Sequence, residues 1–339
     1  MTDNPRIILS AFADEAANRK TAVEQFSALC ALGLSYYSPR FIDMEGDGEI
    51  KHVVDLKTAE LKRLIRLHDE FGMNVASIGS RIGKVKLLDL DDGTHNQFVP
   101  FAKYLKTEVA STIRVARALN GRLIRGFSFY HPREEDPRQH IPQAVDQIGQ
   151  IADQCAKADL VYGIEVEANL IGQNGQLLAE LARKLKRSNV VLIFDGGNLA
   201  HQGYSPLEVV EEYRAMRPYL GWMHVKDYQA TINKRPGEAV DENADWNFVP
   251  ANIGDSGHEY VLRDLRNHVT KIERKMKRLG APGLFVEMEP HVKGGGQFGG
   301  FSGPDGMGVA LRGLLSVLDY VGIGYNLTDF NDIRRLRGF

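Results

Sequence analysis

The sequence has few cysteines and almost no net charge. Only two of its 339 residues are cysteines, Cys30 and Cys155, and the formal net charge is −2. Because each cysteine lies in a helical pattern, the pair indicates reduced core thiols in a cytoplasmic protein rather than a disulfide framework. The low charge excludes a global field that would draw the chain to nucleic acid or to an anionic membrane.

Long apolar runs and nucleotide-binding motifs are also absent. No apolar run is long enough to span a bilayer, and residues 1–6 lead into a short apolar segment without a signal-peptide pattern. No strand-like segment is followed by a GxGxxG or GxxxxGK(S/T) element, which disfavours the dinucleotide-binding and P-loop forms of an open sheet. We therefore expect a cytoplasmic protein with no nucleic-acid or membrane partner.

The sequence does contain a regular alternation of strand-like and helix-like segments. Such alternation predicts an α/β protein with a parallel sheet, and about eight units in a chain of this length favour a closed barrel. We therefore expect a single (β/α)8 TIM barrel over residues 1–339. Strands are expected at 7–12, 34–38, 74–78, 123–129, 160–167, 190–195, 220–225 and 283–289. Helices are expected at 19–32, 58–71, 99–119, 143–158, 176–186, 206–217, 260–279 and 307–320.

The last expected strand, 283–289, places two carboxylates on one face. Side chains alternate along a strand, so Glu287 and Glu289 point the same way. Two carboxylates on one face of a buried strand are costly unless positive charge meets them, and a metal ion is the simplest source of that charge. The alternative is a strand neutralised by salt bridges. The glycine-rich run 294–301 that follows could bring backbone N–H groups to a ligand or act as a lid.

Three other expected strands end in residues that bind divalent ions. The fifth carries Glu165 and Glu167, the sixth ends in Asp195, and the seventh carries His224. Active-site residues of a barrel come from the C-terminal ends of its strands, so these side chains would meet those of the last strand at one rim. Carboxylates with one imidazole suit a single Mn, Mg, Co or Zn ion with open coordination positions.

With these segments the chain resembles the sugar isomerase/epimerase superfamily that has a xylose-isomerase-like TIM barrel. The resemblance extends over about residues 7–320 and is carried by 164–169, 193–198, 224–227, 289–291 with 296–304, and 77–84. It implies one divalent metal ion, with the ligands Glu165, Asp195, His224 and Glu289. Because Glu165 and Glu289 each have a second glutamate two positions away, Glu167 and Glu287 are the alternative ligands.

The resemblance also implies an activity. A related enzyme would isomerise or epimerise a carbohydrate substrate, which is a keto-sugar, a sugar acid or a cyclitol, by proton transfer through an enediolate. Glu165 and Glu289 would be the catalytic residues. Asn198 stands where epimerases of this group often have histidine, and a homodimer is expected from the family. The expected substrate-binding residues are Glu167, Asn198, Lys226 and His291.

Other interpretations stay open from the sequence. A dehydratase or lyase acting on a keto-sugar or keto-inositol could use the same metal site, and a non-catalytic sugar-binding barrel would not need four aligned ligands. Endonuclease-like phosphodiester hydrolysis is disfavoured, because more histidines and a basic rim would be needed. A lysine or arginine that bridges the acids in place of an ion would remove the basis for the sugar chemistry.

Arginines at the ends of other strands are further candidates for ligand binding. Arg40, Arg81 and Arg125 lie on or beyond the second, third and fourth expected strands. Each could bind a phosphate or a carboxylate, but the position of Arg125 inside its strand favours an ion pair within the barrel.

Overall fold

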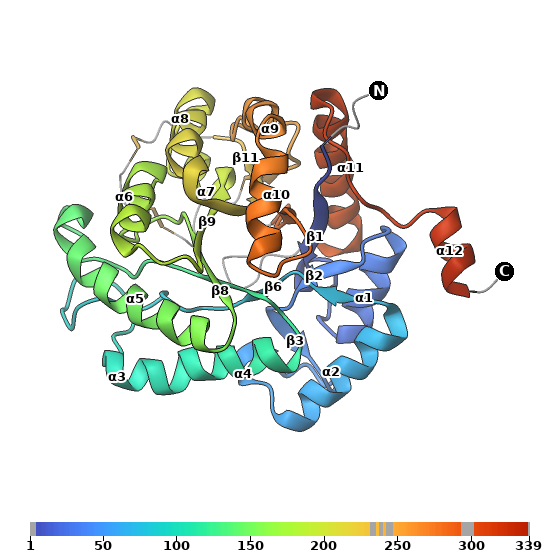
Figure 1. The fold of residues 1–339 in the computed structure, drawn as a ribbon, viewed down its shortest axis with the longest axis horizontal. Coiled ribbons are helices and arrows are strands. Elements are labelled where there is room, and N and C mark those ends of the chain that lie inside the picture. Colours follow the sequence, from blue (N-terminus) through green and yellow to red (C-terminus); the bar gives the residue numbers. More distant parts are fainter. Residues whose placement is uncertain (1–4, 231–234, 237–239, 242–246, 293–301, 338–339) are drawn as a thin grey trace.

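One parallel sheet forms the centre of the computed structural model, which describes residues 5–230, 235–236, 240–241, 247–292 and 302–337. Its strand order is β5-β2-β1-β13-β10-β9-β8-β7-β6. The strands at the two ends of this order, β5 (Asn74–Val75) and β6 (Ser77–Gly79), are halves of one segment separated by Ala76. Because β5 pairs with β2 and β6 pairs with β7, the sheet closes through this segment. The structure therefore confirms the TIM barrel (Figure 1).

Strands β9 and β10 begin and end where the sequence predicts. The paired part of several others is shorter than expected, because the chain leaves the barrel at their C-terminal ends to form the rim. After β7, for example, Phe127 and Phe129 donate backbone hydrogen bonds to the carbonyls of Ile82 and Gly83 in the loop after β6. The remaining strands of the barrel are β1 (Ile8–Phe12), β2 (Tyr36–Ser38), β7 (Leu123–Gly126), β8 (Val161–Glu165), β9 (Val190–Asp195), β10 (Leu220–Val225) and β13 (Phe285–Met288).

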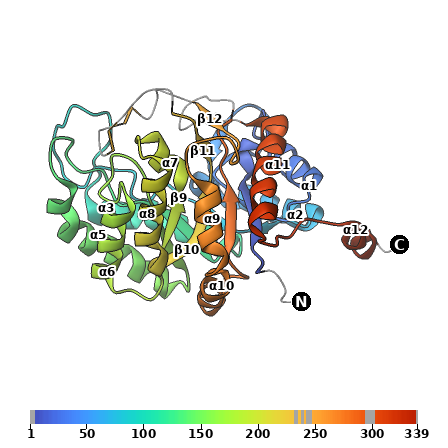
Figure 2. The ribbon, with the colours of Figure 1, turned by 90° about the horizontal axis from the view of Figure 1, so that it is seen from above.

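Helices surround the sheet (Figures 1 and 2). One expected helix is wrong as a single helix: the segment 260–279 is divided at Asn267 and His268, which are weak helix formers. The expected helix 99–119 is present at residues 101–118, with a π-helical turn at Leu105–Val109. The outer helices are α1 (Ala22–Ala31), α2 (Thr58–Phe71), α3 (Phe101–Tyr104), α4 (Ala110–Ala118), α5 (Ile141–Lys157), α6 (Gly175–Leu185), α8 (Pro206–Met216), α9 (His258–Arg266), α10 (Val269–Arg278) and α11 (Gly303–Val321).

Several short elements are not evident from the sequence pattern. Helix α7 (Gly196–His201) begins at two glycines, which are poor helix formers, but Asp195 caps it by accepting a hydrogen bond from the N–H of Asn198. Helix α12 (Phe330–Arg337) lies away from the barrel in Figure 1. Two antiparallel pairs complete the described structure: β3 (Phe41–Asp43) with β4 (Ile50–His52), and β11 (Asp227–Tyr228) with β12 (Phe248–Val249).

The two cysteines differ in their exposure. Both are free, and Cys155 is buried in α5 as expected of a core thiol, whereas Cys30 is exposed. The expectation for Cys30 was wrong because the core-facing side of α1 is formed by Ala22, Gln25, Phe26 and Leu29, and Cys30 lies outside this side. Among the described helices, none combines the length and the apolar character needed to cross a membrane.

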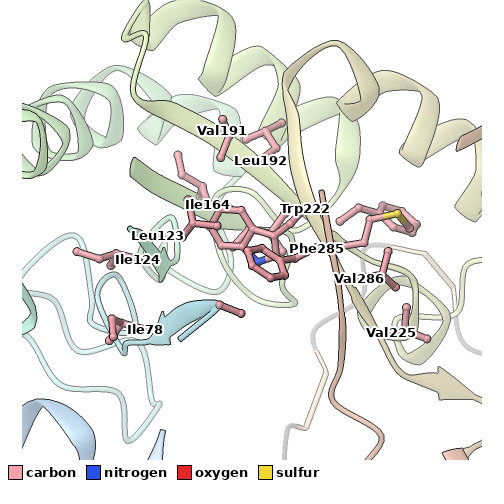
Figure 3. Packing of buried hydrophobic residues seen from close by; sticks show 14 of the residues in the cluster. Ile78, Leu123, Ile124, Ile164, Val191, Leu192, Trp222, Val225, Phe285 and Val286 are labelled. Atoms are coloured by element: carbon pink, nitrogen blue, oxygen red, sulfur yellow. The ribbon is translucent and has the colours of Figure 1, made fainter. Parts of the chain in front are cut away.

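The interior of the barrel is filled by large side chains that face small ones. Trp222 of β10 is only 1% exposed, and Figure 3 shows it with Phe285 at the centre of the packed apolar residues. Gly163 on β8 leaves room for the indole, because a Cβ atom at this position would lie 2.1 Å from the indole Cη2. The closed barrel thus accepts the tryptophan only because the facing strand carries no side chain here.

We expect Gly163→Ala to lower the free energy of unfolding by about 1–3 kcal/mol, because the enclosed indole cannot move away from the added methyl group. Gly149→Ala in α5 is the matched control. Its added Cβ would meet nothing closer than 3.8 Å, so the better helix propensity of alanine should stabilise the protein by about 0.5–1 kcal/mol. Urea unfolding followed by circular dichroism measures both, and equal effects would contradict this account of the packing.

Candidate metal centre and active site

The ends of three adjacent strands and the residue after a fourth bring four side chains to one rim of the barrel. Glu165 and Asp195 end β8 and β9, His224 is the penultimate residue of β10, and Glu289 directly follows β13. The parallel register places His224 beside Asp195 on one neighbouring strand and beside Glu287 on the other. Four residues that are far apart in the sequence therefore meet at the C-terminal face.

One donor atom from each of Glu165, Asp195, His224 and Glu289 lies within 4.8 Å of the other three. All four side chains are buried. His224 Nδ1 is 3.1 Å from Glu165 Oε1 and 3.7 Å from Glu289 Oε2. Asp195 Oδ2 and His224 Nδ1 have no hydrogen-bond partner in the described part of the chain. Buried polar atoms are normally hydrogen-bonded, so this set of oxygen and nitrogen donors fits a divalent ion.

Cations also contact these carboxylates. Lys226 Nζ lies 3.1 Å from Asp195 Oδ2 and 3.3 Å from Glu289 Oε2. Arg125 Nη1 is 3.1 Å from Glu165 Oε2, and Arg40 donates a hydrogen bond to Glu289. The bridging lysine and arginines that the sequence left open as an alternative to an ion are therefore present. They offset the negative charge of the acids, but Asp195 Oδ2 and His224 Nδ1 form no hydrogen bond within the described residues, although Lys226 and Glu165 lie close to them.

The electrostatics of the cluster favour ionised glutamates. Burial raises the pKa of Glu165, but His224 and Arg125 outweigh it and hold that pKa at about 2. Burial is also outweighed at Glu289, where Lys226 and Arg40 hold the pKa well below its ordinary value. At Asp195 burial exceeds the opposing effect of Lys226, so its pKa is raised. Both glutamates are thus ionised at neutral pH, so each can accept a proton or bind a metal ion.

Glu287 and Glu167, the alternative ligands, lie outside the cluster. Glu287 is completely buried beside the imidazole, with its Oε1 3.3 Å from His224 Nε2. It also accepts hydrogen bonds from the hydroxyls of Ser10, Ser38 and Ser77. A carboxylate on the second nitrogen fixes the orientation of a ligand histidine, which leaves Nδ1 facing the donors.

Glu167 lies beyond the end of β8, where its Oε2 is 2.9 Å from Lys84 Nζ. Asn198, from α7, instead contacts the cluster directly. Its Nδ2 donates to Glu165 Oε1 at 3.3 Å and to the carbonyl of Val166 at 2.9 Å. Of these two expected substrate-binding residues, the structure therefore places Asn198 against the cluster and Glu167 in a neighbouring ion pair.

His291 is held next to Glu289 by a buried residue whose role the sequence analysis missed. Its Nδ1 lies 3.0 Å from Glu15 Oε1, and its Nε2 lies 3.8 Å from Glu289 Oε1. Glu15 and Asp14 also bind Arg40. The sequence could have indicated both acids, because they follow the first strand and the C-terminal ends of all barrel strands lie at the same rim.

A cavity of about 240 Å³ opens at this rim. Glu165, Glu289 and Lys226 contribute to its wall, so the donor cluster can be reached from it. The glycine-rich run 294–301 lies outside the described residues. The other residues that line the cavity are Arg40, Phe41, His52, Ser80, Arg81, Lys84, Arg125, Phe127, Glu167 and His291.

Fold and site together define a TIM barrel with a candidate divalent-ion centre at its C-terminal rim. The family model described as xylose isomerase-like TIM barrel matches residues 28–285. The chain belongs to this family, as the sequence analysis expected. A search of curated proteins found no match.

Solved structures with the same fold share little sequence with this chain. A probable 3-DHS dehydratase, AsbF, from Bacillus anthracis is 14% identical, with a TM-score of 0.61 over 91% of this chain and 98% of that one. A xylose isomerase-like TIM barrel protein from Mycobacterium smegmatis in complex with magnesium is also 14% identical, with a TM-score of 0.59 over 95% and 99%. A D-psicose 3-epimerase in the presence of D-fructose is 15% identical, with a TM-score of 0.59 over 93% and 100%.

We expect Arg40→Met to destabilise the protein by about 3–5 kcal/mol, because three buried carboxylates lose their shared cation. Arg187→Met is the control: this arginine forms a partly exposed pair with Asp153, and its loss should cost about 1 kcal/mol or less. Urea unfolding in the presence of a chelator compares the two without interference from bound ions. A similar, small cost for both variants would show that Arg40 does not hold the acids together.

Proposed function

We propose that this protein is a divalent-metal-dependent isomerase or epimerase of a keto-sugar, a sugar acid or a cyclitol. The observation that carries the proposal is the buried cluster of Glu165, Asp195, His224 and Glu289, in which Asp195 Oδ2 and His224 Nδ1 form no hydrogen bond within the described residues. The magnesium complex and the epimerase among the similar folds support it.

The four clustered residues would hold one Mn, Mg, Co or Zn ion. When bound, such an ion polarises a carbonyl oxygen and so acidifies the adjacent C–H bond. Glu287 would keep the imidazole of His224 in the orientation that leaves Nδ1 available. Lys226 and Arg125 would then be partly released from the acids that they contact, and could face the substrate.

Proton transfer would be the task of Glu165 and Glu289. They come from β8 and from the end of β13, with β9 and β10 between them in the sheet, so they approach the cavity from different sides. One carboxylate removing a proton and the other returning it on the opposite face gives epimerisation, whereas return by the same group to the neighbouring carbon gives isomerisation. Lys226 would offset negative charge on the enediolate oxygen.

A dehydratase is the second candidate, and the pair of His291 and Glu15 favours it. Loss of a hydroxyl group needs an acid close to the base, and Glu15 holds His291 with its Nε2 3.8 Å from Glu289 Oε1. The probable dehydratase among the similar folds supports this candidate. The two reactions differ in their product, since only dehydration releases water and forms a conjugated double bond.

Metal binding distinguishes the proposed ligands from their neighbours. We expect one ion per chain, and we expect Glu165→Gln to weaken Mn²⁺ binding by at least about tenfold, whereas Glu167→Gln changes it little. Isothermal titration calorimetry gives both affinities. Chelation should also lower the melting temperature, because the ion binds only the folded state. The absence of stoichiometric binding to the unsubstituted protein would refute the proposal, and the reverse order of the two variants would reassign the ligand.

Proton exchange tests the role of Glu289. Glu289→Gln should reduce incorporation of deuterium from D₂O next to the carbonyl of a keto-sugar by about 10²-fold or more, because the amide cannot accept the proton. NMR spectroscopy of a panel of sugars and sugar acids measures exchange and separates epimer, isomer and dehydration product. Circular dichroism checks that the fold is retained. Undiminished exchange in the folded variant would remove Glu289 from the mechanism.

A further inference from the structure

We infer that the substrate carries a carboxylate close to the reacting carbon and that Arg125 binds this group. The inference rests on the proposed function of the same site and narrows its substrate class to sugar acids and related hydroxy acids. It begins from an arginine that the sequence analysis favoured as an internal ion-pair partner, and whose donors the structure leaves largely unused.

Arg125 is only 7% exposed, yet it lines the cavity together with Glu165 and Glu289. A guanidinium group carries five N–H donors. Within the described residues, only its Nη1 donates a hydrogen bond, to Glu165, and its Nε is buried without any partner. Buried donors without partners cost free energy. A ligand with acceptor oxygens in the cavity would therefore gain hydrogen bonds that the protein does not itself make.

Two aromatic rings hold the guanidinium plane of Arg125. Its Cζ lies 4.9 Å from the centre of the Phe12 ring and 4.8 Å from that of Phe127. Cation–π contacts of this kind fix the plane without using any N–H donor. A planar, fixed fork of donors matches the two oxygens of a carboxylate better than it matches scattered hydroxyl groups.

Four other lysines and arginines line the described part of the cavity wall. Lys84 is paired with Glu167, and each of the other three contacts at least two carboxylates. Arg125 has one close carboxylate partner, Glu165, and a second, Glu289, at 3.9 Å. Arg125 is thus the cation of this group with the most capacity for an added anion. The other three and their partners are Arg40 with Asp14, Glu15 and Glu289, Arg81 with Asp55 and Glu108, and Lys226 with Asp195 and Glu289.

The surroundings favour a carboxylate over a phosphate. Glu165, Glu167 and Glu289 also line the cavity, so a dianionic phosphate would be repelled more strongly than a singly charged group. The Nη1 atom of Arg125 lies 3.1 Å and 3.9 Å from the two glutamates proposed to move the proton. A group bound to this arginine would therefore sit within one or two carbons of the reacting carbon.

Matched probes test the inference by calorimetry. D-gluconate and D-glucitol share a carbon skeleton and differ in one carboxylate, and D-glucitol 6-phosphate carries a phosphate instead. We expect the unsubstituted protein to bind gluconate at least about tenfold more tightly than glucitol. Arg125→Met should bring the two affinities within about twofold by weakening gluconate alone. Arg81→Met, which changes another arginine of the same wall, should keep the preference.

Titrations with and without Mg²⁺ separate recognition by the arginine from chelation by an ion. A preference for gluconate that survives Arg125→Met would overturn the inference, as would equal binding of the three probes, no binding of gluconate, or tighter binding of the phosphate. Arg125→Lys keeps the charge but not the planar set of N–H donors, so it should lose part of the preference for gluconate over glucitol. This variant replaces Arg125→Met in the test if the methionine variant does not fold. Mg²⁺ titration without sugar tests the proposed function separately.

Discussion

The rim of this barrel depends on the neutralisation of carboxylates that the fold buries together. Strands β8, β9 and β13 bring Glu165, Asp195, Glu287 and Glu289 to a space from which water is largely excluded, and β10 between them brings His224. Such a concentration of negative charge is unfavourable unless cations share it. Lys226, Arg40 and Arg125 supply positive charge, and Asp195 Oδ2 and His224 Nδ1 are the atoms of the cluster that still lack a hydrogen bond within the described residues.

The same requirement links the fold to the proposed chemistry. Charges held in place by a closed sheet need little reorganisation when the charge of a substrate changes, which is the condition for electrostatic catalysis. Phe12 shows how one side chain can position several of these charged groups. Its ring lies beside both Arg40 and Arg125 and packs edge-on against His224. A single apolar side chain therefore positions groups on β7, on β10 and in the link between β2 and β3 without competing for their hydrogen bonds.

The sequence predicts the barrel well because the periodicity and the length of the apolar segments identify most of the strands and helices. Strands 190–195 and 220–225 coincide with β9 and β10, since apolar runs bounded by polar residues mark buried parallel strands clearly. The prediction of short elements and of helix breaks fails because single residues decide them. The helix after Asp195 begins with two glycines, and the break at Asn267 and His268 interrupts a pattern that is otherwise continuous.

The candidate site could be anticipated only in part. Strand ends identify which residue types reach the rim, but alternation cannot choose between Glu287 and Glu289, because both point inward. The choice depends on depth along the strand: Glu287 meets the three serines and Glu289 meets the cations. The role of Arg125 was equally hidden, since only the structure shows that its hydrogen bond to Glu165 uses one donor among five.

The closure of the sheet at Ala76 has a consequence for the motions of the molecule. The register of β2 with β5 has only two positions, Tyr36 and Tyr37, and its register with β1 also has two, so this seam lies in the part of the cylinder with the shortest strand pairing. Ser80 and Arg81, which follow β6, belong to the wall of the cavity next to this seam. Amide hydrogen exchange should be fastest along it, and this side of the barrel mouth is the one with the most freedom to adjust to the size of a bound molecule.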